Sequence, residues 1–132
     1  MKPRTVAIMV AGTVCLGSVF LGTPSVAAQS RPDRLVRIAE LEIDPGQLEA
    51  YKSALREEIE ASMRMEPGVL TLYAVAVKDQ PNQIRLLEVY AGTAAYQAHL
   101  QSAHFLKYKT QTVHMVKSLK LIETEPLLLG SK

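Results

Sequence analysis

The spacing of hydrophobic and polar residues changes several times along the chain, and each change predicts a different element. Residues 35–43 alternate, with Val36 and Leu41 on opposite sides, which predicts a β-strand. Residues 48–63 instead carry apolar side chains three and four positions apart, which predicts an amphipathic helix. The apolar stripe of this helix consists of Leu48, Tyr51, Leu55, Ile59 and Met63.

Capping residues predict where the helices begin. Asp44 is expected to cap the first helix, with Pro45 at its first position and Gln47 reaching back as a capping box. Thr93 is expected to cap a short helix, and Ser102 to cap another helical piece soon after it. That last piece repeats at helical spacing through Phe105, Tyr108, Thr112 and Met115.

Three further strands are predicted. Residues 69–77 are nearly all apolar and rich in β-branched side chains, which is typical of a strand buried on both faces. The turn signal at residues 79–82 makes residues 83–91 the second strand of a hairpin, and residues 119–125 form the last strand.

The resulting order, β-α-β-β-α-β, predicts an α+β fold of the ferredoxin-like type, an antiparallel sheet with its helices on one face. The two hairpin strands are apolar on both sides, yet the helices cover only one of them. An exposed apolar patch of this size is rare on soluble monomers. The sequence therefore predicts a homodimer that packs sheet against sheet.

The first 28 residues read as a cleaved signal peptide. Met1-Lys2-Pro3-Arg4 is basic, residues 5–21 are apolar and uncharged, and small residues precede the expected cleavage after Ala28. The alternative is a membrane anchor, for which the apolar run is short. We expect a flexible leader at residues 29–34, a mature domain at residues 35–132, no stable membrane anchor after cleavage, and a periplasmic or secreted location.

Composition narrows the possible partners. Loss of Lys2 and Arg4 with the signal leaves basic and acidic residues equal in number, so we expect no nucleic-acid partner. Cys15, the single cysteine, is lost as well, which excludes a disulfide framework. The histidines are five and ten residues apart, without His-x-x-x-His, and no glycine-rich phosphate fingerprint occurs. No metal and no cofactor is therefore expected.

Three motifs carry a family resemblance. Glu66-Pro67-Gly68-Val69, Glu88-Val89-Tyr90-Ala91 and Ala95-Tyr96-Gln97-Ala98-His99-Leu100, followed by Ser102-Ala103-His104-Phe105, resemble the antibiotic biosynthesis monooxygenase family. The resemblance implies a dimeric α/β barrel of ferredoxin-like subunits, and oxygenation of a small phenol or quinol by molecular oxygen without a cofactor. The family also includes haem degraders and sugar-phosphate isomerases. The chain has no Trp, and its single Asn, Asn82, is in a predicted turn, so the Asn-and-Trp pair of some members is missing.

Candidate site residues follow from what such chemistry requires: a base, donors around an oxyanion, and apolar walls. An imidazole titrates near neutral pH, which makes His99 the candidate base, with Glu88 orienting or tuning it. The substrate-binding candidates are Tyr73, Tyr90, His104, Phe105 and Tyr108.

A structural interpretation stands beside each candidate. His99 equally fits a packing role as hydrogen-bonded partner of Glu88 or of the Glu66 region, and the tyrosines fit the core. For His104 a capping or exposed role is an alternative, and for His114 a structural or exposed one. The function that we predict is an exported, cofactor-independent monooxygenase. The alternative is a small-molecule-binding or isomerase-type protein of the same fold, and a third possibility is a structural dimer.

Overall fold

The computed structural model describes residues 33–128 and confirms the predicted order of elements. The predicted signal peptide, residues 1–28, and most of the predicted leader lie outside the described residues. The elements are β1 (Leu35–Ile43), the short 3-10 helix η1 (Pro45–Gln47), α1 (Leu48–Met65), β2 (Val69–Val77), β3 (Gln80–Tyr90), α2 (Thr93–Gln101), α3 (Ala103–Thr112) and β4 (Val116–Thr124).

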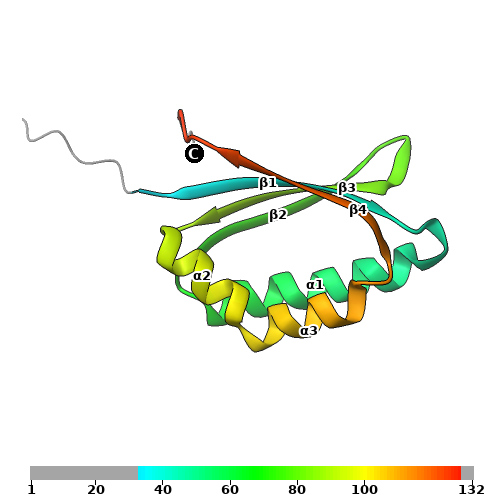
Figure 1. Ribbon diagram of the computed structural model, residues 1–132, viewed down its shortest axis with the longest axis horizontal. Coiled ribbons are helices and arrows are strands. Elements are labelled where there is room, and N and C mark those ends of the chain that lie inside the picture. Colours follow the sequence, from blue (N-terminus) through cyan, green and yellow to red (C-terminus); the bar gives the residue numbers. More distant parts are fainter. Residues whose placement is uncertain (1–32, 129–132) are drawn as a thin grey trace, which may run out of the picture.

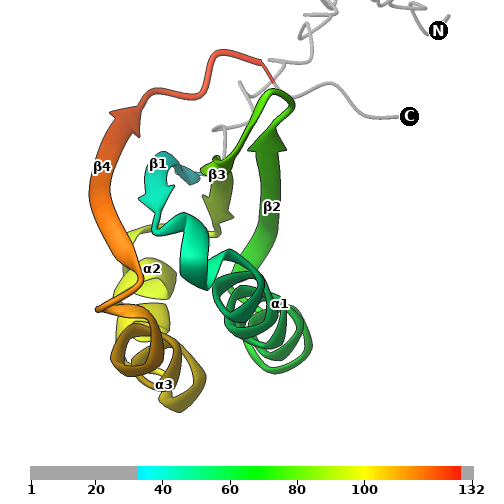
Figure 2. The ribbon, with the colours of Figure 1, turned by 90° about the vertical axis from the view of Figure 1, so that its right-hand side faces the viewer.

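The strands form one antiparallel sheet in the order β2-β3-β1-β4. All three α-helices lie on the same face of it (Figure 1). Figure 2, which looks along the helices, shows α1 beneath β2 and α3 on the side of β4. This two-layer arrangement is the predicted ferredoxin-like α+β fold.

The core lies between β1, β3 and α1. Ala39 pairs with Leu86 and Leu41 pairs with Ile84 across the two strands, and all four side chains are buried. Tyr51 and Leu55 of α1, with Ile43 at the end of β1, complete the same apolar cluster. Alternation along β1 and β3 therefore fixes which side chains face the helices.

The hairpin and β4 start earlier than predicted. The chain turns at Lys78 and Asp79, so β3 begins at Gln80 instead of residue 83. Pro81 is tolerated there because it lies beyond Gln83, the last β3 residue that pairs with β1. β4 begins at Val116 instead of residue 119, because it pairs with the end of β1 across a register shift.

Two of the four capping predictions are confirmed. Asp44 accepts a hydrogen bond from the Gly46 backbone N–H (2.9 Å), with Pro45 first in η1. The capping box is wrong, because the Gln47 side-chain amide donates to the backbone carbonyl of His114 instead (3.3 Å). Ser102 caps α3 by accepting from the Phe105 N–H (3.3 Å). Thr93 is the first residue of α2 and not its cap.

The buried stripe of α1 departs from the predicted one in its second half. Tyr51 and Leu55 are buried as expected, but the stripe continues through Glu58 and Ser62. Met63 is 46% exposed. The helical repeat of 3.6 residues thus carries two polar side chains into the interior, where each needs a partner.

The outer face of the sheet is uncovered by any helix of the described residues, and part of it is apolar. Tyr73 and Val75 of β2 and Leu87 of β3 are exposed on it. Strand β2 is thus apolar on both faces as predicted, whereas the outer face of β3 also carries Gln83 and Arg85. Within residues 33–128, no helix combines the length and apolarity needed to cross a membrane.

Candidate active site

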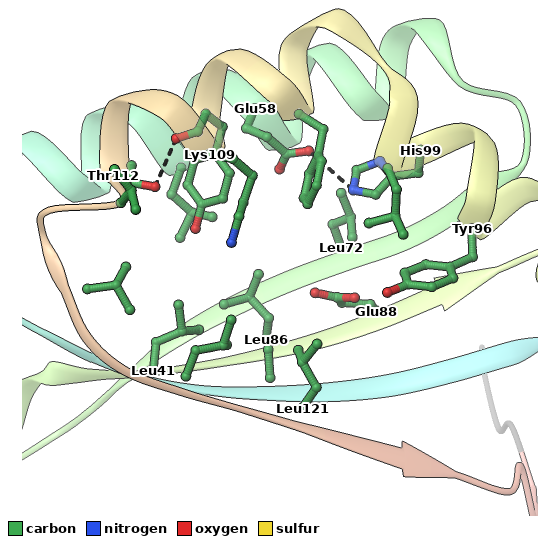
Figure 3. A pocket seen from close by; sticks show the side chains of 18 of the residues that line it. Leu41, Glu58, Leu72, Leu86, Glu88, Tyr96, His99, Lys109, Thr112 and Leu121 are labelled. Carbon is green, nitrogen blue, oxygen red and sulfur yellow. Dashed lines mark hydrogen bonds and ion pairs between the residues drawn. The ribbon is translucent and has the colours of Figure 1, made fainter.

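A cavity of about 480 Å³ opens between the sheet and the helices on its covered face (Figure 3). Such a volume suits a small-molecule ligand. Its wall is mostly apolar, with Leu41, Leu72, Leu86, Leu119 and Leu121 from the strands and Leu55, Leu100, Phe105 and Tyr108 from the helices. Its polar side chains include Glu58, Glu88, Tyr96, His99, Lys109 and Thr112.

His99 is the centre of the polar groups. It lies in the last turn of α2, is 3% exposed, and packs against the rings of Phe105 (4.6 Å between centroids) and Tyr90 (5.4 Å). Its Nδ1 lies 3.0 Å from Oε1 of Glu66, which is the C-cap of α1. The hydrogen bond therefore connects α2 to the end of α1.

The same Glu66 oxygen also contacts Nε2 of His104, at 2.5 Å, so that one carboxylate joins two imidazoles. Burial alone would raise the pKa of Glu66, but hydrogen bonds from His99 and His104 outweigh it and hold that pKa below its usual value. An ionised carboxylate only accepts hydrogen bonds. Nδ1 of His99 consequently carries the proton, and in the neutral ring Nε2 keeps its lone pair.

Glu58 occupies the other side of the His99 ring. Its Oε1 accepts a hydrogen bond from the Ser62 hydroxyl (2.7 Å) and lies 3.7 Å from Nε2 of His99. Burial raises the pKa of Glu58, and the Ser62 hydrogen bond and His99 offset part of this rise. Glu58 was not predicted from the sequence, although its spacing from Leu55 and Ser62 continues the buried stripe of α1.

Glu88 lies on the sheet side of the cavity, opposite Glu58 (Figure 3). It accepts a hydrogen bond from the Tyr90 hydroxyl (3.2 Å), and burial raises its pKa. The expected parity is confirmed, because Glu88 faces the helices and lines the same cavity as His99. Its expected direct pairing with His99 is not found: the hydrogen-bond partner of His99 is Glu66, the alternative that the sequence had left open.

Arg37 of β1, which pairs with Glu88 across the sheet, was also missed. Its guanidinium lies over the ring of Tyr96 (4.5 Å to the centroid) and donates to the Tyr96 hydroxyl and to Glu123 (2.9 Å). This cation–π contact anchors the start of α2 to the sheet. Arg37 therefore acts on the site through Tyr96, which lines the cavity.

Three buried tyrosines in and behind the cavity wall are neutral hydrogen-bonding groups. The hydroxyls of Tyr108 and Tyr51 lie 2.7 Å apart, and burial raises the pKa of both, as it does for Tyr90. Hydroxyls of this kind donate hydrogen bonds but do not act as bases near neutral pH. Phe105 contributes apolar wall, as predicted.

Two predicted substrate-binding residues lie outside this cavity. Tyr73 is 64% exposed on the opposite face of the sheet, because its neighbour Leu72 takes the cavity-facing position of β2. His104 lies behind the cavity wall, against Glu66. His114 is exposed, as expected. The roles of the remaining candidates stay predictions.

The helices also bring together a set of groups that no local motif suggested. One ligand atom each of Glu58, His99 and His104 lie within 4.8 Å of one another. The three residues come from α1, α2 and α3. Glu58 is far from the histidines along the sequence, so a motif defined by short residue spacing could not predict this cluster.

Residues 34–111 match the family described as "Antibiotic biosynthesis monooxygenase". A crystal structure of a protein from Bacteroides thetaiotaomicron VPI-5482, named as a proposed member of that family, is 52% identical, with a TM-score of 0.73 over 76% of this chain and 95% of that one. A similarly named protein from Nitrosomonas europaea is 25% identical, with a TM-score of 0.69 over 74% of this chain and 94% of that one.

A proposed monooxygenase from Lactobacillus acidophilus NCFM is 29% identical, with a TM-score of 0.67 over 70% of this chain and 44% of that one. Comparison with curated proteins returned no match.

Proposed function

The chain belongs to the antibiotic biosynthesis monooxygenase family, and from this premise we propose that it oxygenates a small phenol or quinol without metal or flavin. The observation that supports the proposal most is the state of His99. Its Nδ1 is held by Glu66, which leaves the lone pair on Nε2, and the His99 side chain lines the cavity. A base with a defined tautomer in an apolar cavity is what deprotonation of a phenol requires.

Deprotonation is the first step of the proposed reaction. Nε2 of His99 takes the phenolic proton, and the imidazolium that forms lies between two carboxyl groups. Glu66 contacts its Nδ1 at 3.0 Å, and Glu58 lies 3.7 Å from its Nε2. The ionised carboxylate of Glu66 offsets the positive charge that the ring takes up, which lowers the cost of proton transfer.

The phenolate needs compensating charge and a dry surrounding. Lys109 of α3 points into the cavity (Figure 3), where its ammonium group is placed to attract an oxyanion. The Tyr108 hydroxyl is a second donor on the same helix. Leucine side chains and Phe105 keep water from the anion, which strengthens both interactions.

Oxygen then supplies the oxidising power. The phenolate transfers one electron to molecular oxygen, and the resulting radical pair combines to a peroxide at a ring carbon. Loss of water from the peroxide leaves one oxygen atom on the substrate, so that a quinol and oxygen give a hydroxyquinone and water. The four electrons come from the quinol, and no external reductant is needed.

We propose further that the protein is a homodimer. The uncovered face of the sheet carries Tyr73, Val75 and Leu87, a patch that a second sheet of the same kind would cover. Leu127 and Leu128, after β4, are almost fully exposed and would add to the contact. Such packing would close two sheets into the barrel that the family resemblance implies.

We also propose export with cleavage near Ala28, on the basis of the basic and apolar residues before it. The mature protein would then act in the periplasm or outside the cell. Intact-mass analysis of the exported protein tests this. A membrane-bound product that retains residues 1–28 would contradict it.

The central experiment measures oxygen consumption by chelator-treated protein against a panel of quinols and phenols. Uptake is expected, and His99→Gln should lower turnover by roughly 10²–10⁴-fold. The matched control is His114→Gln, because His114 is exposed and does not line the cavity. Ligand binding without oxygen uptake across the panel would refute the oxygenase and favour the binding or isomerase alternative.

A further inference from the structure

We propose that Glu58, His99 and His104 form a binding site for one divalent transition-metal ion at the helix side of the cavity. The three ligand atoms lie within 4.8 Å of one another. Metal–ligand distances of about 2.0–2.2 Å place two ligands of a tetrahedral site roughly 3.3–3.6 Å apart. Each of the three side chains would therefore have to move by less than about 1 Å to contact one ion.

The donor set indicates the class of ion. Two imidazoles and one carboxylate suit Zn²⁺, Fe²⁺, Co²⁺ and their neighbours, and are poorly suited to Ca²⁺ or Mg²⁺, which prefer oxygen ligands. Three protein ligands leave at least one coordination position open. Glu58 and His99 line the cavity, so an ion has a path to the site and its open position would face the cavity.

The groups around the three ligands resemble those that orient metal ligands. Glu66 accepts the Nδ1 hydrogen bond of His99, which leaves Nε2 as the ligand atom. Ser62 donates to Oε1 of Glu58 and fixes that carboxylate. The rings of Phe105 and Tyr90 pack on His99 and surround it with apolar groups. On binding an ion, His104 would give up its hydrogen bond to Glu66.

Charge balance favours the same conclusion. Glu58 and Glu66 are both largely buried, and within residues 33–128 their ion-pair partners are His99 and His104 alone. No Lys or Arg of the described chain pairs with either carboxylate. Buried carboxylates need compensating charge, which two imidazolium protons or one divalent cation would supply.

This inference goes beyond the proposed function and has a consequence for it. Nε2 of His99 is both the proposed base and a proposed ligand, so one atom serves either the proton or the ion. Metal binding should therefore inhibit cofactor-free oxygen uptake in competition with the substrate. The metal site would act as a switch on the reaction.

The test titrates Co²⁺ into chelator-treated protein and follows visible absorption, with thermal unfolding in Zn²⁺ alone as a second readout. We expect saturation at one ion per chain and a rise in melting temperature. His104→Gln, which keeps a donor for Glu66, and Glu58→Gln should each weaken the affinity at least tenfold. His114→Gln should bind like the parent. Circular dichroism of each variant checks that it is folded.

The outcomes separate the two proposals. Absence of a Co²⁺ spectrum up to millimolar metal, or binding that is lost in His114→Gln and kept in His104→Gln, overturns the site. Oxygen uptake that continues in the absence of any metal binding would leave the proposed function intact. Oxygen uptake that requires the ion would support the site and refute cofactor-free oxygenation.

Discussion

Replacement of Glu66 by Gln tests how the helices hold the site. Glu66 accepts hydrogen bonds from both His99 and His104 on one oxygen (3.0 and 2.5 Å). The amide keeps the shape and one acceptor but loses the charge. A hydrogen bond to a charged group contributes about 1.5–3 kcal/mol and a neutral one about 0.5–1.5 kcal/mol. Two such losses predict destabilisation of about 2–3 kcal/mol.

The assay is thermal unfolding at one fixed protein concentration, because dimer formation would make the melting temperature depend on concentration. A domain of this size shifts by about 4–8 °C for each kcal/mol, so Glu66→Gln should lower the melting temperature by roughly 8–24 °C. Glu60→Gln is the matched control, because Glu60 is an exposed glutamate of the same helix. It should change the melting temperature little.

The pH dependence gives a second and sharper test. The pKa of the Glu66 carboxyl group is lower in the folded protein than in the unfolded chain, where it is about 4.3. The ionised Glu66 therefore stabilises the fold fully above a pH of about 4.3, and this contribution is lost as pH falls through the folded pKa. The gap between parent and Glu66→Gln should therefore be full at about pH 7 and should close in more acidic solution. A gap below about 2 °C at neutral pH, or one that persists in acid, would refute the reasoning.

Three further predictions concern other parts of the molecule. Burial raises the pKa of Glu88, so ionisation of this carboxyl group costs stability as pH rises through its folded pKa. Glu88→Gln should therefore raise the melting temperature in alkaline solution and not in acid. A melting temperature raised in acid and not in alkaline solution would contradict this. A Cβ at Gly68 would lie 2.5 Å from Cβ of Ala95, so Gly68→Ala should displace α2 and lower the melting temperature, with partial recovery in the double variant with Ala95→Gly. No recovery would mean that the contact is not the cause. Tyr73→Glu, on the uncovered sheet face, should give a monomer in sedimentation, whereas an unchanged dimer would place the interface elsewhere.

Much of the fold follows from local properties of the sequence. β1 runs over Leu35–Ile43 as predicted, and Ser102 caps α3 as predicted, because alternation and capping depend on residues a few positions apart. The same alternation placed Glu88 on the helix side of the sheet. Local pattern predicted some boundaries wrongly, such as the start of β3, because pairing with a distant strand decides the register there.

The composition of the site depended on the tertiary structure. Tyr73 lies outside the cavity, although it was predicted to bind substrate. Because β2 is apolar on both faces, its sequence does not reveal that Leu72 faces the cavity. Glu58 was missed because the rotation of α1 about its axis is set by packing on the sheet, which turned Glu58 inward and left Met63 exposed. The contacts of Glu66 with the histidines join residues more than thirty positions apart. Local periodicity determines each element and its faces, whereas only the docking of three helices on one sheet decides which polar side chains meet.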